Sequence, residues 1–428
     1  MKTQPPLTTL RELALVAVFA LAVVPPLGAE DCPPFANVDW SRTSVGLPPL
    51  TDLGAGFYNG QQGGLYPGGS NLRPPAHEIA GLALARSVEP LDAAGQPDPN
   101  GKLVLLSIGM SNPSLEFATF MPLADADSLR HPQLVLVNGA QGGQQARDWA
   151  ENSLTNGKPW GKLSETLDRA GVTTNQVSVV WIKLANGFPT GTNFADALLL
   201  KNYLITIVQR LKAKFPNLKL AYLSSRIYAG YSTTGEQPEP YAYEEAFSFK
   251  WLIEDQLNGA AALNYDPVRG PVLAPWLAWG PYLWADGLTP RSDGLVWTCE
   301  DFIRTDGQPT DAIHPGGVGR AKIANLLLNF FKTDTTGREW FLADWAVTPI
   351  DIVQAELNPI TGHFLLSWTT LPAAKYQVQH SPDLAAWSNA GPPLTAVTNL
   401  LSWTDDGTQT GTPPSQATWR YYRVQVLP

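Results

Sequence analysis

Residues 102–112 read Lys-Leu-Val-Leu-Leu-Ser-Ile-Gly-Met-Ser-Asn. The first seven are mostly apolar, as in a strand that is buried on both faces of a sheet. Gly109 and Ser111 follow at once, where such a strand would turn into a helix. Ligands of open α/β folds bind at the carboxyl ends of the strands. The stretch therefore predicts a parallel strand with Ser111 just beyond its carboxyl end.

Three more apolar runs repeat this pattern, and helix-like segments separate them. The runs are residues 133–137, 176–184 and 217–223. Residues 196–215 place an apolar side chain at every fourth position, which is typical of one face of a helix. A final helix is indicated by the apolar residues between Ile323 and Phe331. This alternation predicts an α/β fold in which helices cover both faces of a parallel sheet.

The sequence pattern changes near residue 346. Beyond it, short stretches of alternating apolar and polar residues are separated by turn clusters such as Asp405-Asp406-Gly407. Such alternation is typical of a small all-β sandwich, and the composition resembles that of fibronectin type III-like modules. We therefore expect three parts, at residues 1–29, 30–345 and 346–428.

The N-terminal segment is typical of a secretory signal peptide. Lys2 and Arg11 precede an apolar stretch from Leu13 to Val24, and residues 25–29 end in Ala29. The apolar stretch is too short to favour a membrane helix, and no other segment of the sequence reaches a spanning length. We expect cleavage after Ala29 and a secreted or periplasmic protein.

Charge and cysteine content narrow the class of protein further. Acidic residues outnumber basic ones by 38 to 29, and this balance argues against partners such as nucleic acid or anionic membranes. The two cysteines, Cys32 and Cys299, could pair in an exported protein or remain as two buried thiols. Because no Cys/His cluster has metal-ligand spacing, we expect neither a metal nor a cofactor.

The sequence contains five histidines, and these are the candidates for a general base. Only His314 has a carboxylate at a helpful spacing, that of Asp311 three residues earlier. A serine at a strand end, followed late in the chain by an Asp-x-x-His pair, supplies the parts that a serine esterase needs. For Ser111 alone, the capping of a helix is the commoner explanation.

Two further turn segments follow predicted strands. Residues 138–143 read Asn-Gly-Ala-Gln-Gly-Gly, and residues 185–187 read Ala-Asn-Gly. A glycine N–H or an asparagine side-chain amide at these places could donate a hydrogen bond to a developing oxyanion. Ordinary turns are the alternative explanation for both segments.

Taken together, these segments resemble the SGNH hydrolases, also called GDSL-type esterases, over about residues 102–332. The resemblance implies a flavodoxin-like sheet of five parallel strands. It implies Ser111 as the nucleophile, with Asp311 and His314 completing a catalytic triad. It also implies an oxyanion hole formed by the backbone N–H of Ser111 together with Gly143 and Asn186.

The segments also depart from the family pattern. Met110 stands where the family usually has aspartate, so the first segment looks most like the Gly-Gln-Ser-Asn variant of sialate and xylan acetylesterases. Ala140 replaces a frequent glycine, which makes Gly143 the better oxyanion donor and Gly142 its rival. The residues on either side of Asn186 differ as well.

The segment between the third turn and the histidine is rich in aromatic residues. Rings stack on sugars, so Trp279, Tyr282, Trp284 and Trp297 could form a carbohydrate-binding wall, with Arg226 contacting a polar or acidic group. Core packing is the alternative explanation for each ring. We expect a secreted serine esterase that removes small acyl groups, acetyl above all, from carbohydrate. A lipolytic or aryl esterase and a catalytically inactive glycan-binding protein remain the alternatives.

Overall fold

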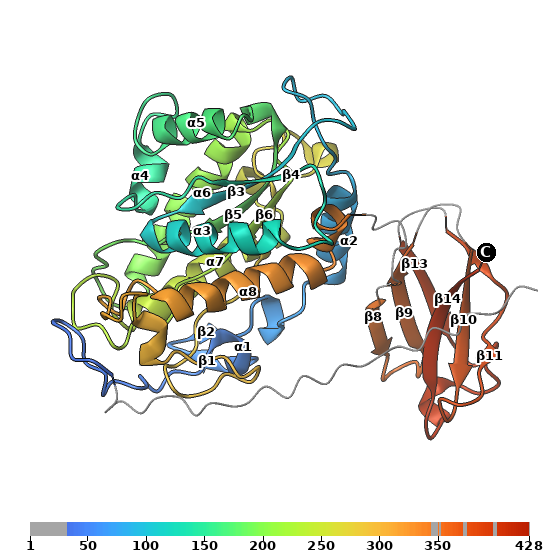
Figure 1. Ribbon diagram of the computed structural model, residues 1–428. Coiled ribbons are helices and arrows are strands. Elements are labelled where there is room, and N and C mark those ends of the chain that lie inside the picture. The colour runs from blue at the N-terminus through green and yellow to red at the C-terminus, as the bar shows by residue number, and fades with distance from the viewer. Residues whose placement is uncertain (1–31, 344–349, 351, 371–374, 397–399, 428) are drawn as a thin grey trace, which may run out of the picture.

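The computed structural model describes residues 32–343, 350, 352–370, 375–396 and 400–427. Helices surround a parallel sheet in the first part, and a separate antiparallel β region follows (Figure 1). The expected signal peptide and the expected boundary at residue 346 lie outside the described residues. Within the described ranges, no helix is long and apolar enough to cross a membrane.

Five parallel strands form the central sheet. They are β3 (Leu103–Gly109), β4 (Leu134–Asn138), β5 (Val177–Lys183), β6 (Leu220–Leu223) and β7 (Trp276–Trp279). They lie side by side in the order β4-β3-β5-β6-β7, and every neighbouring pair is parallel. The first four strands lie within the four apolar runs or extend one residue past them, so the predicted parallel sheet is confirmed.

Helices cover this sheet, as the sequence predicts. The longer ones are α2 (Pro75–Arg86), α3 (Ser111–Asp125), α5 (Trp160–Arg169), α6 (Ala195–Lys214), α7 (Tyr241–Leu257) and α8 (Gly317–Thr333). Three short helices are α1 (Leu50–Leu53), α4 (Ala146–Glu151) and α9 (Arg338–Phe341), and a small hairpin pairs β1 (Phe57–Tyr58) with β2 (Gln61–Gln62). Helix α3 packs against α8, and α6 packs against α7 and α4 (Figure 1).

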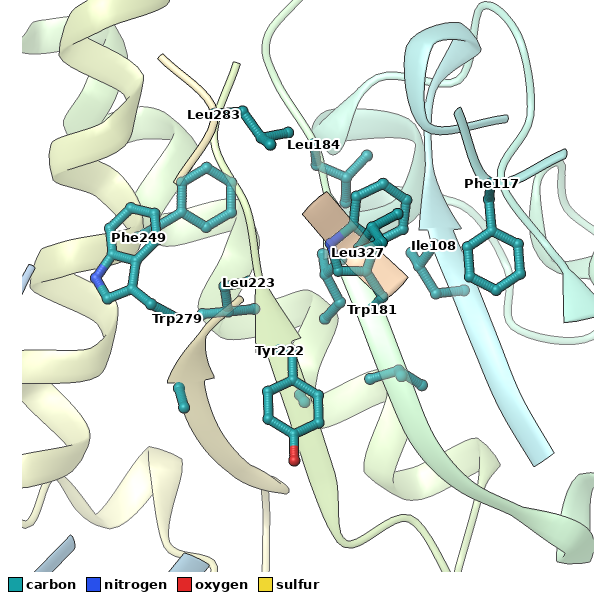
Figure 2. Close-up of a cluster of buried hydrophobic side chains, with 14 of the residues drawn as sticks. Ile108, Phe117, Trp181, Leu184, Tyr222, Leu223, Phe249, Trp279, Leu283 and Leu327 are labelled. Atoms are coloured by element: carbon teal, nitrogen blue, oxygen red, sulfur yellow. The ribbon is translucent and has the colours of Figure 1, made fainter. Parts of the chain in front are cut away.

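The main core lies between the sheet and the helices (Figure 2). Trp181 of β5 stacks on Phe117 of α3, with ring centroids 5.9 Å apart. Tyr222 of β6 packs edge-on against Phe331 of α8 at 5.8 Å. Because Trp181 and Tyr222 are partners in adjacent strands, both rings point to the same face of the sheet. Burial of these rings fixes α3 and α8 over that face.

Two antiparallel sheets form the C-terminal region. Their strands are β8 (Ile352–Leu357), β9 (Phe364–Thr369), β10 (Lys375–Ser381), β11 (Ser388–Asn389), β12 (Leu394–Thr395), β13 (Leu400–Asp405) and β14 (Tyr421–Leu427). One sheet has the order β13-β9-β8, and in the other β10 pairs with β11, β12 and β14. Trp368, Tyr376 and Trp403 bring the two sheets together in one buried cluster. The predicted all-β region is thus confirmed, whereas the likeness to fibronectin type III stays a prediction.

A buried ion pair joins β5 to α3. The Nζ atom of Lys183 lies 2.6 Å from Oε1 of Glu116, and the two side chains are 1% and 0% exposed. Burial lowers the pKa of Lys183 to about 8, although the charge of Glu116 favours the protonated form. Each buried charge is therefore stabilised by its oppositely charged partner rather than by water.

We expect the loss of one member of this pair to be worse than the loss of both. Lys183→Met removes the hydrogen-bonded counter-ion of a buried carboxylate, which then keeps only the longer-range charge of Arg226, and should lower the free energy of unfolding by about 3–5 kcal/mol. The Lys183→Met/Glu116→Leu double variant should recover part of that loss in urea unfolding. The exposed pair Arg304 and Asp306, with side chains 58% and 50% exposed, is the control and should couple by less than about 1 kcal/mol. A double variant as unstable as the sum of its singles would contradict the interpretation.

Candidate active site

Ser111 is the first residue of α3, directly after β3. The turn between them is tight at Gly109, where an added Cβ would overlap the ring of Pro113 and the carbonyl oxygen of Lys183. Glycine is therefore required sterically at this position. The turn holds the serine at the carboxyl edge of the sheet, as the sequence predicts.

A chain of two hydrogen bonds connects Ser111, His314 and Asp311. The Ser111 Oγ atom lies 2.6 Å from Nε2 of His314. The other ring nitrogen, Nδ1, lies 2.7 Å from Oδ2 of Asp311. The fold thus brings together, from positions about 200 residues apart, the three residues that the sequence singled out.

The loop that carries His314 is folded around the carboxylate of Asp311. Its Oδ1 atom accepts hydrogen bonds from the backbone N–H groups of Ile313, at 3.0 Å, and His314, at 2.9 Å. Ala312 has a φ of 57°, in the left-handed region that non-glycine residues rarely adopt. Asn112 ties this loop to the serine turn, because its Nδ2 donates to the carbonyl of Ile313 at 2.8 Å.

The same contacts keep Asp311 ionised. Burial by itself would raise the pKa of this carboxyl group, but the hydrogen bonds and charge of His314 outweigh burial and lower the pKa below its ordinary value. A charged Asp311 accepts the Nδ1–H of the imidazole and leaves Nε2 free to accept a proton. The geometry can therefore move a proton from the Ser111 hydroxyl to His314.

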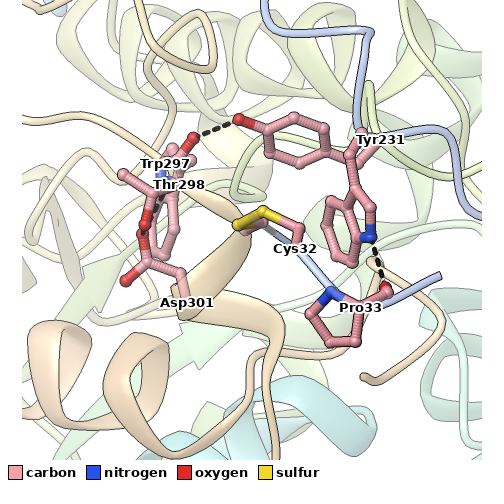
Figure 3. The surroundings of a disulfide bond; sticks show 8 residues. Cys32, Pro33, Tyr231, Trp297, Thr298 and Asp301 are labelled. Atoms are coloured by element: carbon pink, nitrogen blue, oxygen red, sulfur yellow. Dashed lines mark hydrogen bonds between the residues drawn. A yellow bond between two sulfur atoms is a disulfide. The ribbon is translucent and has the colours of Figure 1, made fainter. Parts of the chain in front are cut away.

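A disulfide joins Cys32 to Cys299, and Figure 3 shows it close to Trp297, Thr298 and Asp301. Cys299 begins a short 3-10 helix, Cys299–Phe302, and the carbonyl of Asp301 in that helix accepts the N–H of Gly316 at 2.7 Å. Phe302 likewise accepts the N–H of Thr310 at 2.7 Å. The pairing that the sequence left open is thus present, and it links the start of the described chain to the segment on both sides of His314.

The other two turn segments meet the serine turn at the same edge. Gln141 donates its backbone N–H to the carbonyl of Gly109 at 2.9 Å, and Gly187 donates to Oε1 of Gln145 at 2.6 Å. Ser111 follows β3 and Asn186 follows β5, two adjacent strands whose connections leave in opposite directions along the sheet. Such a point is where open α/β sheets form a crevice for ligands.

The oxyanion donors expected from the sequence lie in these segments. A Cβ added to Gly142 would be 3.9 Å from Cβ of Ser111, whereas one added to Gly143 would meet nothing within 4 Å. The Nδ2 atom of Asn186 donates to the side-chain Oδ1 of Asp196 at 3.1 Å, which fixes the orientation of the amide. The roles of Gly143 and Asn186 stay predictions, and Gly142 is the glycine beside the serine.

The four aromatic side chains that we expected to form a carbohydrate-binding wall are buried, and their contact with a sugar stays a prediction. All four residues are at most 4% exposed. The indole N–H groups and the tyrosine hydroxyl form hydrogen bonds inside the protein. Trp279 ends strand β7 and donates to the carbonyl of Leu65 at 2.8 Å. Trp279 is buried because the fifth parallel strand runs through this segment, whereas Tyr282, Trp284 and Trp297 lie after that strand and pack into the core.

Arg226 is 3% exposed, and its Nε and Nη2 atoms have no hydrogen-bond partner within the described part of the chain. Burial lowers the pKa of this guanidinium, while the charges of Glu245, Glu116, Glu236 and Asp311 favour its protonated form. Burial also raises the pKa of Glu245 well above its ordinary value, against the effect of Arg226. Arg226 thus lies in a buried group of charges that extends to Asp311, and its contact with substrate stays a prediction.

Sequence reasoning missed the side chains that hold the three turns together. Gln237 is 1% exposed and donates from Nε2 to the carbonyl of Asn186 at 3.1 Å and to Sδ of Met110 at 3.7 Å. Oε1 of Glu245, on α7, accepts the backbone N–H of Asn186 at 3.0 Å. Neither residue belongs to a motif, so nothing in the sequence marks them. No group of three or more His, Cys, Asp or Glu side chains that could hold a metal ion occurs in the described ranges.

Comparisons with known proteins give only distant likenesses. No protein-family profile and no curated sequence matches the chain. A carbohydrate acetylesterase from Xanthomonas citri is similar in structure, with 12% identity, a TM-score of 0.30, and coverage of 71% of this chain and 72% of that one. The periplasmic domain of a lipopolysaccharide acetyltransferase from Salmonella ser. Paratyphi A has 14% identity, a TM-score of 0.30, and coverage of 54% and 84%.

A protein of Bacillus subtilis has 15% identity and a TM-score of 0.29, with coverage of 55% of this chain. The present chain spans 57% of the length of that protein. These likenesses are too remote to support an inference about activity.

We expect the disulfide to stabilise the histidine loop specifically. A variant with Cys32→Ser and Cys299→Ser should lose about 2–5 kcal/mol of unfolding free energy. Amide hydrogen exchange in residues 299–317 should accelerate more than exchange in β5, because the loop loses its covalent support. Wild-type protein under reducing conditions is the matched control and should behave like the variant. If amide hydrogen exchange in residues 299–317 is unchanged in the variant, the disulfide does not support the histidine loop.

Proposed function

We propose that this protein is a serine esterase of the SGNH hydrolase type. The observation that supports the proposal is the hydrogen-bonded chain from Ser111 through His314 to Asp311 at the carboxyl edge of the sheet. The strand order of the sheet is 2-1-3-4-5 when the parallel strands are numbered along the chain, which is the flavodoxin-like order that the family resemblance implies.

In the proposed mechanism, Nε2 of His314 takes the proton of Ser111 as the hydroxyl attacks the ester carbonyl. Asp311 holds the imidazole in the productive tautomer and stabilises its positive charge. His314 then gives the proton to the departing alcohol, and the acyl group stays on Ser111. Water attacks this acyl-enzyme with His314 again as base, which releases the acid and restores the serine.

The negative charge of the tetrahedral intermediate needs donors near the serine. We assign this role to the backbone N–H groups of Ser111 and of the glycine pair Gly142 and Gly143, and to the side chain of Asn186. The hydrogen bond from Asn186 to Asp196 orients the amide before substrate arrives. Donors fixed in advance stabilise the transition state more than the substrate, because no reorganisation is needed when charge develops.

We further propose that the acyl group is acetyl and that its carrier is carbohydrate. The Gly-Met-Ser-Asn segment, similar to that of sialate and xylan acetylesterases, supports this choice. The disulfide is compatible with a secreted or periplasmic site of action. A lipolytic or aryl esterase would instead prefer long-chain or aryl esters, and an inactive glycan-binding protein would hydrolyse none.

We propose that residues 346–428 are an accessory domain to the catalytic unit at residues 30–345. The described strands of this region bury their own apolar cluster, which includes Trp368 and Tyr376. Ser111, His314 and Asp311 all come from the α/β part. A fibronectin type III-like fold remains part of this proposal.

Ser111→Ala and His314→Ala should each abolish hydrolysis of p-nitrophenyl acetate, because each removes a group that takes part in bond making. Ser128→Ala and His363→Ala, which lie elsewhere in the chain, should keep wild-type rates. A fluorophosphonate probe should label Ser111 alone, as read by peptide mass spectrometry. Wild-type turnover by Ser111→Ala would overturn the proposed function.

Asn186→Ala should lower kcat by roughly a hundredfold or more with little change in KM, because the missing hydrogen bond matters most in the transition state. Asp196→Ala removes the side-chain partner of the amide but keeps the amide, and its loss should be smaller. Steady-state kinetics with p-nitrophenyl acetate separate the two. Equal losses in both variants would assign Asn186 a structural role only.

A further inference from the structure

A cavity of about 570 Å³ lies beside the edge strand of the parallel sheet. Its walls come from α3, from β4 and the turn that follows it, and from α5. Leu136 and Val137 of β4 and Met121 of α3 contribute apolar surface. The strand β4 pairs with β3 on one side only, so nothing in the sheet covers this edge.

Ser111 does not itself line the cavity, but one end of the cavity reaches the turns beside it. Gly142 lines it, and the same glycine is the one whose added Cβ would lie 3.9 Å from Cβ of Ser111. Ser114, one helical turn after Ser111 on α3, lines it too. A ligand with its ester at Ser111 could therefore extend past Gly142 into the cavity.

The other wall of the cavity is cationic. Lys158, Lys162 and Arg169 line it, and no aspartate or glutamate is among its lining residues. Lys162, Thr166 and Arg169 are spaced four and three residues apart on α5, which places them on one face of the helix. The acidic residues of the same helix, Glu165 and Asp168, do not line the cavity.

These cations are not neutralised within the protein. None of the three forms an ion pair with another described residue within 4.0 Å, and Arg169 donates only to the carbonyl of Glu165 and the hydroxyl of Thr166. The chain as a whole carries a formal net charge of −9. The three cations of this cavity thus have a charge opposite in sign to the net charge of the chain, and together they favour the binding of an anion.

We propose that this cavity binds the carboxylates of an acidic sugar chain, so that the enzyme deacetylates uronate-containing rather than neutral carbohydrate. The inference rests on the proposed function and names the substrate class of the same site. The apolar surface of β4 and α3 contacts the C–H faces of the sugar rings, while Lys158, Lys162 and Arg169 contact the carboxylates. The ester bond is hydrolysed by water at Ser111 as before, and the cations only bind and orient the chain.

The test compares three substrates of equal length: acetylated oligogalacturonate, the same chain with its carboxyl groups methyl-esterified, and acetylated cello-oligosaccharide. Acetate release measures kcat/KM for each. We expect the acidic chain to be preferred by roughly tenfold or more at low salt, and the preference to decline as salt screens the charges. Equal rates on the acidic and the methyl-esterified chains would overturn the proposal.

A triple variant, Lys158→Gln/Lys162→Gln/Arg169→Gln, should lose this preference and keep its rate on p-nitrophenyl acetate. The control triple variant, Arg42→Gln/Arg269→Gln/Lys375→Gln, changes the net charge equally at exposed positions that do not line the cavity, and it should keep the preference. If both triple variants behave alike, long-range charge rather than this cavity is responsible, and the proposal fails.

Binding gives a readout that does not depend on hydrolysis. Titration calorimetry with unacetylated oligogalacturonate should show binding to wild-type protein and to Ser111→Ala, and at least tenfold weaker binding to the cavity variant. No binding to wild-type protein overturns the inference even where hydrolysis of p-nitrophenyl acetate upholds the esterase. If wild-type protein binds oligogalacturonate but shows no esterase activity, the proposed function is wrong and the anion-binding site is supported.

Discussion

The absence of space for a side chain at Gly109 is the constraint on which the site depends. The strand β3 ends there and α3 begins two residues later, with the ring of Pro113 and the carbonyl of Lys183 filling the volume that a Cβ would need. This close approach allows Gln141 to bond to the carbonyl of Gly109, and so joins the turn after β4 to the turn after β3. A wider turn would separate the serine both from the glycine pair and from the loop of His314.

Buried charge is the second organising feature at this edge. Lys183 of β5 pairs with Glu116 of α3, and Arg226 is influenced by the charges of Glu245, Glu116 and Asp311. Removing these groups from water is costly, so each persists only because the fold holds a counter-charge nearby. The cluster therefore links the positions of β5, β6, α3 and α7 electrostatically, in addition to the apolar packing between them. The interior beside the site therefore contains buried charges held in fixed positions as well as apolar side chains.

The sequence predicted what depends on local pattern and missed what depends on tertiary neighbours. The four apolar runs became strands, and the spacing of Asp311 and His314 was enough to expect their contact, because an Asx-type turn folds a carboxylate back over three residues. Five strands were expected, but the position of the fifth was missed because Trp276 and Trp279 are aromatic rather than aliphatic, and an aromatic run has no periodicity that separates a buried strand from a binding wall. Gln237 was missed because its importance lies in two contacts with segments more than fifty residues away.

The disulfide also has a consequence for the biosynthesis of the protein. Cys32 is synthesised 267 residues before its partner, so its thiol remains unpaired until nearly all of the α/β part has emerged from the ribosome. Because the chain contains only two cysteines, no wrong intramolecular pairing exists, and oxidation within one molecule can lead only to the native bond. A link between two molecules is a competing product, and its formation depends on the protein concentration whereas closure of the native bond does not. Slow, dilute production therefore favours the correctly closed histidine loop without the help of an isomerase.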